Sequence, residues 1–160
     1  MKKERRYWDT DCFVAWLNKE YGKADKCKGV IQEAERGTIE IITSTLTIAE
    51  VLYLKEHKKI VPEKAEQIAR FFENKYILPI VLDRYIAEMA RTIYWGSNIK
   101  PKDAVHVASA MKAKIIRFDT FDKDLITFSG KIGNPALIIG EPNILSQENF
   151  QYEKRQNPKK

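Results

Sequence analysis

Short β-rich runs alternate with longer helical segments along most of this chain, and that alternation restricts the possible fold more than any other feature. Strands that alternate with helices of about ten or more residues pair in parallel through right-handed crossovers. The pattern therefore predicts an α/β fold, a three-layer sandwich in which helices flank a short parallel sheet. The predicted strands are one that ends near Trp8 and four others at residues 39–42, 76–81, 115–118 and 136–139.

Capping and breaking residues set the expected helix boundaries. Thr45 or Thr47 is expected to cap a helix that runs through Leu54 and carries Glu50 in its first turn. Pro79 suggests that its strand lies at an edge of the sheet. Another helix is expected to start after Asp9, Thr10 or Asp11, and a further one to cover residues 23–36, with Gly37 after its end. The remaining expected helices run from Pro62 to about Asn74, from Asp83 to Trp95 with Gly96 after its end, and from Pro101 to Ala113.

The length and composition favour one compact domain. The chain has 160 residues, of which 44% are apolar, and single domains typically have about 100–200 residues. We expect a folded domain over residues 1–145 and a flexible basic tail over 146–160. The amino-terminus lacks the apolar stretch of a secretory signal and the two cysteines, Cys12 and Cys27, are too few for a disulfide framework, so a cytoplasmic location is expected.

The net charge of +6 lies at the two ends of the chain. Residues 1–6 and 151–160 each carry +3, and the body between them is neutral. Charged termini are often merely solvated, so this distribution indicates a nucleic-acid partner less strongly than a basic face would. If several acids converge at one metal site, however, the rest of the body is mildly basic, which suits binding to phosphates.

Four acidic residues lie where parallel strands are expected to end. Asp9 follows the first strand, Glu50 the second, Asp103 follows Pro101, and Asp122 follows the fourth strand. Ligands collect beyond the carboxyl ends of parallel strands. Each acid alone is explained by helix capping, by the helix dipole or by a surface turn. Together, carboxylate oxygens suit Mg²⁺ or Mn²⁺, and four like charges are hard to keep ionised without a cation.

Four segments of the sequence resemble the PIN domain, and within it most closely the VapC-type toxin ribonucleases. The resemblance spans about residues 7–140, with the motifs in the family's order. The segments are Tyr7-Trp8-Asp9-Thr10-Asp11, Ser44-Thr45-Leu46-Thr47-Ile48-Ala49-Glu50-Val51-Leu52, Pro101-Lys102-Asp103-Ala104-Val105-His106-Val107-Ala108-Ser109-Ala110 and Thr120-Phe121-Asp122-Lys123-Asp124-Leu125.

The resemblance implies a Mg²⁺- or Mn²⁺-dependent endoribonuclease that often forms homodimers and often has an antitoxin partner. Carried over by position, Asp9, Glu50, Asp103 and Asp122 form an acidic quartet. In the mechanism that we expect, Asp9, Asp103 and Asp122 hold one or two ions, and Glu50 orients or deprotonates the attacking water. RNA hydrolysis by this route leaves a 5′-phosphate and a free 3′-hydroxyl.

Two features depart from the family pattern or leave alternatives open. The first strand is preceded by basic residues, so it is expected to be short or to begin late. Asp11 stands where the family often has Asn, and it either joins the metal shell or caps the helix. Asp119, Thr120 and Asp124 are possible auxiliary residues, and Asp122 ranks first because it lies two residues after Thr120.

Other chemistries find less support in the sequence. Asp9-Thr10-Asp11 is similar to the motif of aspartate-nucleophile phosphatases, but that reaction leaves Glu50 and Asp103 without a role. His106 lies in an apolar helix, which favours a packed or hydrogen-bonded histidine over a catalytic one. A non-catalytic interaction module, and a PIN-domain RNA-processing nuclease without an antitoxin, remain alternatives.

Overall fold

The computed structural model describes residues 2–51 and 61–144, and within them five strands form one sheet. The strand order is β3-β2-β1-β4-β5, and every neighbouring pair is parallel. The strands are β1 (Glu4–Trp8), β2 (Ile39–Ser44), β3 (Ile77–Ile80), β4 (Arg117–Asp119) and β5 (Ile138–Gly140). The predicted parallel sheet is confirmed, and β3 with its Pro79 lies at an edge, as expected.

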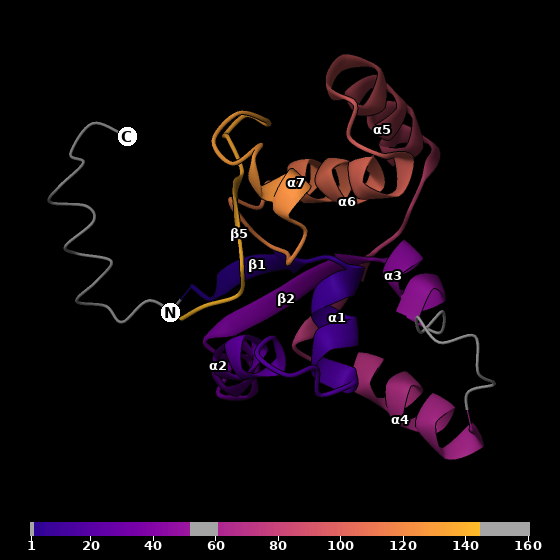
Figure 1. Ribbon diagram of the computed structural model, residues 1–160, viewed down its shortest axis with the longest axis vertical. Helices are drawn as coiled ribbons and strands as arrows, with labels where there is room; N and C mark the ends of the chain where they lie inside the picture. Colours follow the sequence, from indigo (N-terminus) through magenta and orange to yellow (C-terminus); the bar gives the residue numbers. More distant parts are fainter. Residues whose placement is uncertain (1, 52–60, 145–160) are drawn as a thin grey trace, which may run out of the picture.

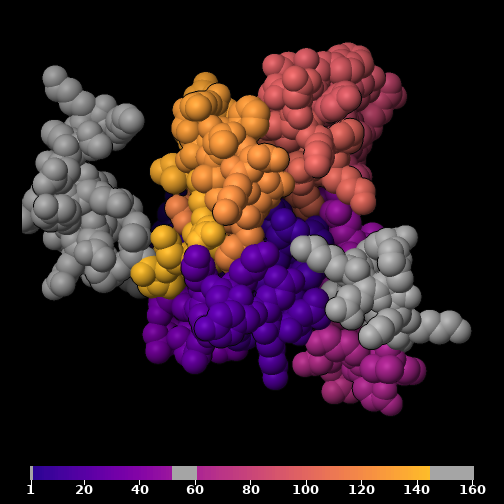
Figure 2. Space-filling view, viewed as in Figure 1, coloured from indigo at the N-terminus to yellow at the C-terminus, as the bar shows by residue number. Residues whose placement is uncertain are grey.

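Helices cover both faces of this sheet, which completes the predicted three layers (Figure 1). One face carries α1, α2 and α4, and the other carries α5, α6 and α7, while α3 follows β2 (Figure 1). In the space-filling view, the orange segment that contains α7 lies above the indigo amino-terminal part (Figure 2). The helices are α1 (Thr10–Leu17), α2 (Ala24–Glu35), α3 (Thr45–Val51), α4 (Pro62–Phe72), α5 (Arg84–Ser97), α6 (Pro101–Lys112) and α7 (Lys123–Ile126).

The two faces bury separate hydrophobic clusters, and the alternation of side chains along β1 explains why. Trp8 belongs to the cluster with α1 and α2, whereas Tyr7, its neighbour, belongs to the cluster with α6. Successive residues of a strand point to opposite faces, so adjacent aromatic residues fill opposite layers. Tyr7 stacks on Phe118 of β4, and Trp8 packs edge-on against Phe13 of α1. No helix in the described part of the chain is long and apolar enough to cross a membrane.

Of the two alternatives predicted for the first strand, a short strand or a late start, the late start is wrong. The strand starts at Glu4, so Arg5 and Arg6 belong to it, and Arg6 is buried. Its guanidinium donates from Nε and Nη2 to the two carboxylate oxygens of Asp119, at 2.9 and 2.8 Å. A charged side chain is tolerated inside a fold when it is paired in this way. The strand therefore extends into the basic segment that the sequence pattern had excluded.

Two helix boundaries also differ from the prediction. Helix α3 starts at Thr45, directly after β2, so Glu50 lies at its sixth position and not in its first turn. The hydroxyl of Ser44 accepts a hydrogen bond from the backbone N–H of Leu46, the role that we had assigned to Thr45 or Thr47. The predicted continuation of this helix through Leu54 lies outside the described residues.

Gly96 does not end α5, which continues to Ser97. The helix ends instead at Asn98, whose backbone has the left-handed φ of 60° and whose N–H bonds to the Tyr94 carbonyl. Asn adopts this conformation more readily than other residues with a side chain, which makes it a common alternative to Gly at this position. The predicted start of α5 is confirmed, because the Asp83 side chain accepts a bond from the Ile86 N–H.

The predicted acidic turn at residues 119–124 is partly wrong. Asp119 is the last residue of β4, and residues 123–126 form the short helix α7, which the sequence pattern did not indicate. Asp122 caps this helix by accepting bonds from the backbone N–H groups of Asp124 and Leu125. The α7 helix has only four residues, too few for a periodic apolar pattern to show.

Candidate active site

Asp9 lies at the junction of β1 and α1 and is almost fully buried. Its Oδ1 accepts a bond from the Cys12 N–H and caps α1, as one of the sequence alternatives proposed, while its Oδ2 accepts a bond from the Thr120 hydroxyl. Burial, and then the charge of Asp11, raise the pKa of Asp9 to about 7. A carboxylate in this setting is costly to ionise without a compensating positive charge.

Thr120 connects Asp9 to Asp122, the last member of the quartet. The Thr120 hydroxyl donates to Asp9 and accepts a bond of 3.0 Å from the Asp122 backbone N–H. This contact places the turn after β4 beside the turn after β1, which the pairing of Trp8 with Asp119 also requires. The parallel strands thus bring the first and last acids of the quartet together at one end of the sheet.

Asp103 lies in the first turn of α6, as predicted, with Pro101 at the start of the helix. Its side chain is half-buried. Burial raises its pKa, and the charges of Asp122, Asp11 and Glu50 raise the pKa further. The negative charges of three other acids thus act on Asp103 and disfavour its ionised form.

Glu50 is held by hydrogen bonds from two other elements. Its Oε1 accepts a bond of 2.9 Å from the Thr10 hydroxyl and lies 3.0 Å from Nε2 of His106. Its Oε2 lies 3.8 Å from the ammonium group of Lys102. Burial alone would raise the pKa of Glu50, but its contacts with His106, Thr10 and Lys102 outweigh burial and lower the pKa.

The possible auxiliary acids occupy different positions. Asp11 is exposed in the first turn of α1, near enough for its charge to raise the pKa values of Asp9 and Asp103. Asp124 is exposed in α7. Asp119 is fully buried, and its carboxylate accepts bonds from Arg6, Trp8 and Arg117. The carboxylate of Asp119 is thus saturated by partners within the protein.

Sequence reasoning did not connect Tyr7, Thr10 and His106 to the quartet. It did predict that His106 is packed or hydrogen-bonded, which the structure confirms, since the side chain is buried and bonded on both ring nitrogens. The spacing of Asp103 and His106 was a usable signal, because residues three apart lie on one face of a helix. The bonding partners of His106 come from β1 and α3, and no local pattern reveals them.

The chemistry of the quartet fits a hard divalent cation. In the part of the chain that the structure describes, no three Asp, Glu, His or Cys side chains lie close enough to enclose an ion by themselves. Mg²⁺ is usually bound through one or two carboxylates, with water and phosphate oxygens as the other ligands. Asp9 and Asp103 carry raised pKa values that partly reflect neighbouring negative charge, and a cation would relieve that repulsion.

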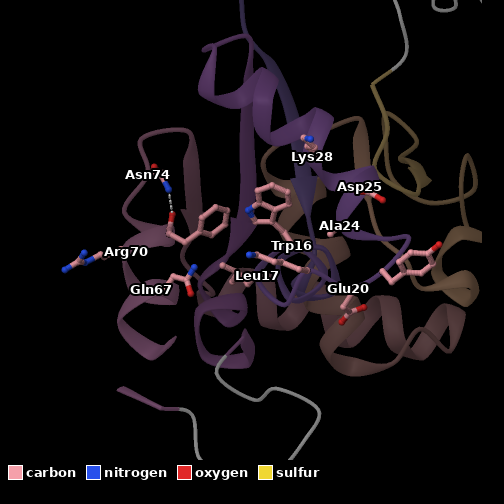
Figure 3. A pocket seen from close by; sticks show the side chains of 12 residues that line it. Trp16, Leu17, Glu20, Ala24, Asp25, Lys28, Gln67, Arg70 and Asn74 are labelled. Carbon is pink, nitrogen blue, oxygen red and sulfur yellow. Dashed lines mark hydrogen bonds between the residues drawn. The ribbon is translucent and has the colours of Figure 1, made fainter. Parts of the chain in front are cut away.

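A separate cavity of about 640 Å³ lies among α1, α2 and α4 (Figure 3). The aromatic rings of Trp16 and Phe71 line it. The charged side chains of Lys28 and Arg70 also line it, as Figure 3 shows together with Trp16. Among the described residues that line this cavity there is no member of the acidic quartet. The quartet therefore does not belong to this cavity.

The fold is similar to that of several solved toxin structures. The VapC20 toxin of Mycobacterium tuberculosis, which cleaves the sarcin–ricin loop, is 17% identical with a TM-score of 0.63, over 76% of this chain and 92% of that one. A toxin–antitoxin complex from Klebsiella pneumoniae is 20% identical with a TM-score of 0.59, over 88% of this chain and 99% of that one. VapBC2 of Rickettsia felis, bound to a DNA fragment from its promoter, is 18% identical with a TM-score of 0.60, over 84% of this chain and 96% of that one.

At these identities the likeness shows a shared fold. No curated protein matches the sequence. The family model of the PIN domain matches residues 6–131, a span that starts within β1, continues past β4 and includes all four members of the acidic quartet. Because that span covers well over half of its length, the chain belongs to the PIN domain family.

Proposed function

We propose that this chain is a metal-dependent endoribonuclease of the VapC type and acts as the toxin of a toxin–antitoxin pair. Its membership of the PIN domain family and its likeness to the fold of VapC toxins support this assignment. Asp9, Asp103 and Asp122 would hold Mg²⁺ or Mn²⁺, and Glu50 would act on the attacking water.

One observation carries the proposal: the charge of Asp122, beyond β4, raises the pKa of Asp103 at the start of α6. A protein that used these acids only as a helix cap and a first-turn residue would gain nothing from bringing their charges within range of each other. Like charges that are brought together are costly unless a cation or a proton offsets them. Their convergence is therefore best explained by a divalent ion.

The residues divide the work of phosphodiester hydrolysis. A bound Mg²⁺ or Mn²⁺ would lower the pKa of a water molecule and neutralise charge on the phosphate. Asp9 is fixed by Cys12 and Thr120, so its carboxylate has a defined direction. The lowered pKa of Glu50 makes it a weak base, so it is better suited to orienting the attacking water than to deprotonating it. The expected products carry a 5′-phosphate and a free 3′-hydroxyl.

The test separates activity from stability in the variants Asp103→Asn and Asp122→Asn. Each removes one charge and keeps the size of the side chain. With Mn²⁺, cleavage of a single-stranded RNA should fall by roughly a hundredfold or more. In chelator, the melting temperature should stay the same or rise, because one repulsion is gone. Added Mn²⁺ should raise the melting temperature of the parent, following RT ln(1 + [L]/Kd), and raise that of the variants much less.

Asp25→Asn is the matched control, because Asp25 lies in the first turn of α2 as Asp103 does in α6. This control should cleave RNA and respond to Mn²⁺ like the parent. An Asp103→Asn or Asp122→Asn variant that still cuts RNA would refute the metal site. If the acids are only caps, the same variants lose about 0.5–2 kcal/mol of stability and keep their activity. Hydrolysis of phosphomonoesters with an intermediate trapped by borohydride would favour the phosphatase.

We also propose an antitoxin partner and a homodimer, as in the resemblance to VapC-type toxins. Two of the similar structures are described as a toxin–antitoxin complex and as VapBC2 on promoter DNA. Co-expression with the small protein of an adjacent reading frame should yield a stable complex that no longer cleaves RNA. If no adjacent protein binds or inhibits the chain while cleavage persists, it is an RNA-processing nuclease without an antitoxin. Sedimentation would establish the oligomeric state.

A further inference from the structure

His106 is a buried polar side chain that lies between the hydrophobic layer of α6 and the acidic quartet. Its Nδ1 lies 2.8 Å from the hydroxyl of Tyr7, which is itself fully buried in β1. Its Nε2 lies 3.0 Å from Oε1 of Glu50 and 3.3 Å from the Thr10 hydroxyl. Both ring nitrogens thus have hydrogen-bond partners, and the ring links the core of the domain to Glu50 of the quartet.

The partners of the ring determine which nitrogen carries the proton. Oε1 of Glu50 is a carboxylate oxygen and only accepts, so Nε2 must donate to it. A tyrosine hydroxyl can both donate and accept, and Nδ1 of a neutral ring that is protonated on Nε2 only accepts, so the Tyr7 hydroxyl donates to it. Tyr7 therefore stabilises the tautomer in which Nε2–H points at Glu50. The Thr10 hydroxyl donates to the same carboxylate oxygen.

These two donors leave the oxygens of Glu50 in different situations. Oε1 is held by His106 and Thr10, whereas Oε2 faces Lys102, whose side chain is largely exposed. One oxygen is anchored, and the other lies toward the exposed side chain of Lys102. A carboxylate with one fixed oxygen has a fixed direction for the other, which is what the orientation of a water molecule requires.

We propose that His106 is a positioning residue for Glu50. Held by Tyr7, it fixes Oε1 of Glu50 through Nε2–H, together with Thr10, so that Oε2 is presented to the attacking water. This inference rests on the proposed ribonuclease function and deepens it, because it assigns a reason for a histidine beside the quartet. His106 acts through Glu50 and makes no contact with the substrate.

The local sequence supports this arrangement, since the elements that hold Glu50 also carry the proposed metal ligands. His106 lies three residues after Asp103 on α6, and Thr10 follows Asp9 at the start of α1. A shift of Glu50 relative to these two elements would therefore also be a shift relative to the metal ligands. Partners that orient a functional side chain in this way typically affect activity by about 10–100-fold.

The first part of the test does not depend on activity. In protein labelled with ¹⁵N in its histidine rings, at pH 8, the long-range ¹H–¹⁵N spectrum should show the His106 proton on Nε2 and none on Nδ1. Exchange of this proton with water should be slow in the parent and faster in Glu50→Gln, where a neutral amide replaces the charged acceptor. A proton on Nδ1 alone, or an exchange rate that Glu50→Gln does not change, would overturn the inference.

The second part compares three replacements of His106 in RNA cleavage with Mn²⁺. Gln places its amide nitrogen near the position of Nε2, so His106→Gln should keep kcat within about threefold of the parent value. Asn places its amide near Nδ1 and Leu has no donor, so His106→Asn and His106→Leu should lose about 10–100-fold in kcat. KM should stay unchanged in all three. Equal losses in His106→Gln and His106→Asn would contradict the positioning role.

A double-mutant cycle separates positioning from mere structural support. If His106 acts through Glu50, His106→Leu should cost nothing further in kcat when it is added to Glu50→Gln. If it only supports the fold, its effect should be the same in both backgrounds. Val107→Ala is the matched control, because Val107 is fully buried next to His106 on α6. It should lower the melting temperature and leave kcat unchanged.

The two parts also distinguish failure of this inference from failure of the proposed function. If the parent protein does not cleave RNA with Mn²⁺, the ribonuclease proposal fails, and the ring spectrum alone decides whether His106 holds Glu50. If the parent cleaves RNA and the cycle is additive, the ribonuclease proposal stands and the positioning role of His106 is refuted.

Discussion

At the scale of single residues, the acids at the carboxyl end of the sheet differ in how their negative charge is balanced. Asp119 is buried but has Arg6 and Arg117 as partners, so its charge is balanced within the fold. Asp9 is as deeply buried, and its carboxylate is beside the charge of Asp11. Asp119 therefore stabilises the fold, whereas an ionised Asp9 lowers the stability of the folded state unless a bound cation offsets its charge.

The pKa of Asp9 predicts how metal-free protein responds to pH. In the folded chain this carboxyl keeps its proton up to about pH 7, because burial and the charge of Asp11 raise its pKa from 3.8. The unfolded chain releases the proton near pH 4, so between these values the folded state binds more protons and its stability falls as the pH rises. Each unit of pKa difference corresponds to about 1.4 kcal/mol.

Urea denaturation in chelator, in steps from pH 4 to pH 8, measures this dependence. Asp9→Asn keeps the cap and removes the ionisation, so its stability should change less over that range than the stability of the parent. The control Asp25→Asn should follow the parent curve. A parent whose stability rises from pH 4 to pH 7 more steeply than that of Asp9→Asn would contradict the raised pKa.

Because Asp119 is paired with Arg6, neutralising it should lower the stability of the protein, in contrast to neutralising a member of the acidic quartet. Asp119→Asn leaves the guanidinium of Arg6 inside the protein without its buried charged partner, and breaking a buried pair costs about 3–5 kcal/mol. Urea denaturation should show this loss. Glu66→Gln removes an exposed pair with Arg70 on α4 and should cost at most about 0.5 kcal/mol. If Asp119→Asn keeps its stability but loses the response to Mn²⁺, Asp119 belongs to the metal shell.

At the scale of helices and strands, two glycines inside helices differ in what surrounds them. A Cβ at Gly29 in α2 would lie 3.0 Å from the Ile144 side chain, whereas a Cβ at Gly96 in α5 meets nothing within 4 Å. Ala stabilises a helix interior by about 0.5–1 kcal/mol over Gly. Gly96→Ala should gain close to this amount in thermal unfolding, and Gly29→Ala should gain clearly less. Equal gains would show that Ile144 does not press on α2.

Elements with a full period of apolar residues were predictable, and those defined by distant partners were not. The strands and the helices α2, α4 and α6 follow from alternation, Gly37, Pro62 and Pro101, which are local signals. The burial of Arg6 depends on Asp119, which lies 113 positions further along the chain. No window of the sequence contains both residues, so the start of β1 could not be placed.

The candidate site shows the same division. The positions of Asp9 after β1 and of Asp103 in the first turn of α6 followed from the sequence. Glu50 was placed on the right element but in the wrong turn, because the junction of β2 and α3 has no spacer. The bonds from Thr10 and His106 to Glu50 join three elements, and only the three-dimensional structure brings these residues together.

At the scale of the whole molecule, the charge distribution gives one more prediction. Residues 151–160, which lie outside the described part, carry half of the net charge of +6. Their removal should leave the melting curve unchanged and make RNA affinity less dependent on salt, since each lost phosphate contact lowers the slope of log K against log [salt] by about 0.7 for a single strand. Full-length protein with Gln at the four basic positions of the tail should match the truncated chain. An unchanged slope would refute a role for the tail in RNA binding.

Within residues 2–51 and 61–144 the sheet ends at β3 on one side and at β5 on the other, and both strands are poor templates for further strands. At one edge β3 has four residues, and Pro79 has no N–H to offer a neighbouring chain, while at the other edge β5 has only three residues. Proteins use short edge strands and prolines in this way to avoid edge-to-edge aggregation. An incoming strand would find little backbone to pair with at either end. Among the described elements, the outer faces of the helices therefore offer more surface for association than the edges of the sheet do.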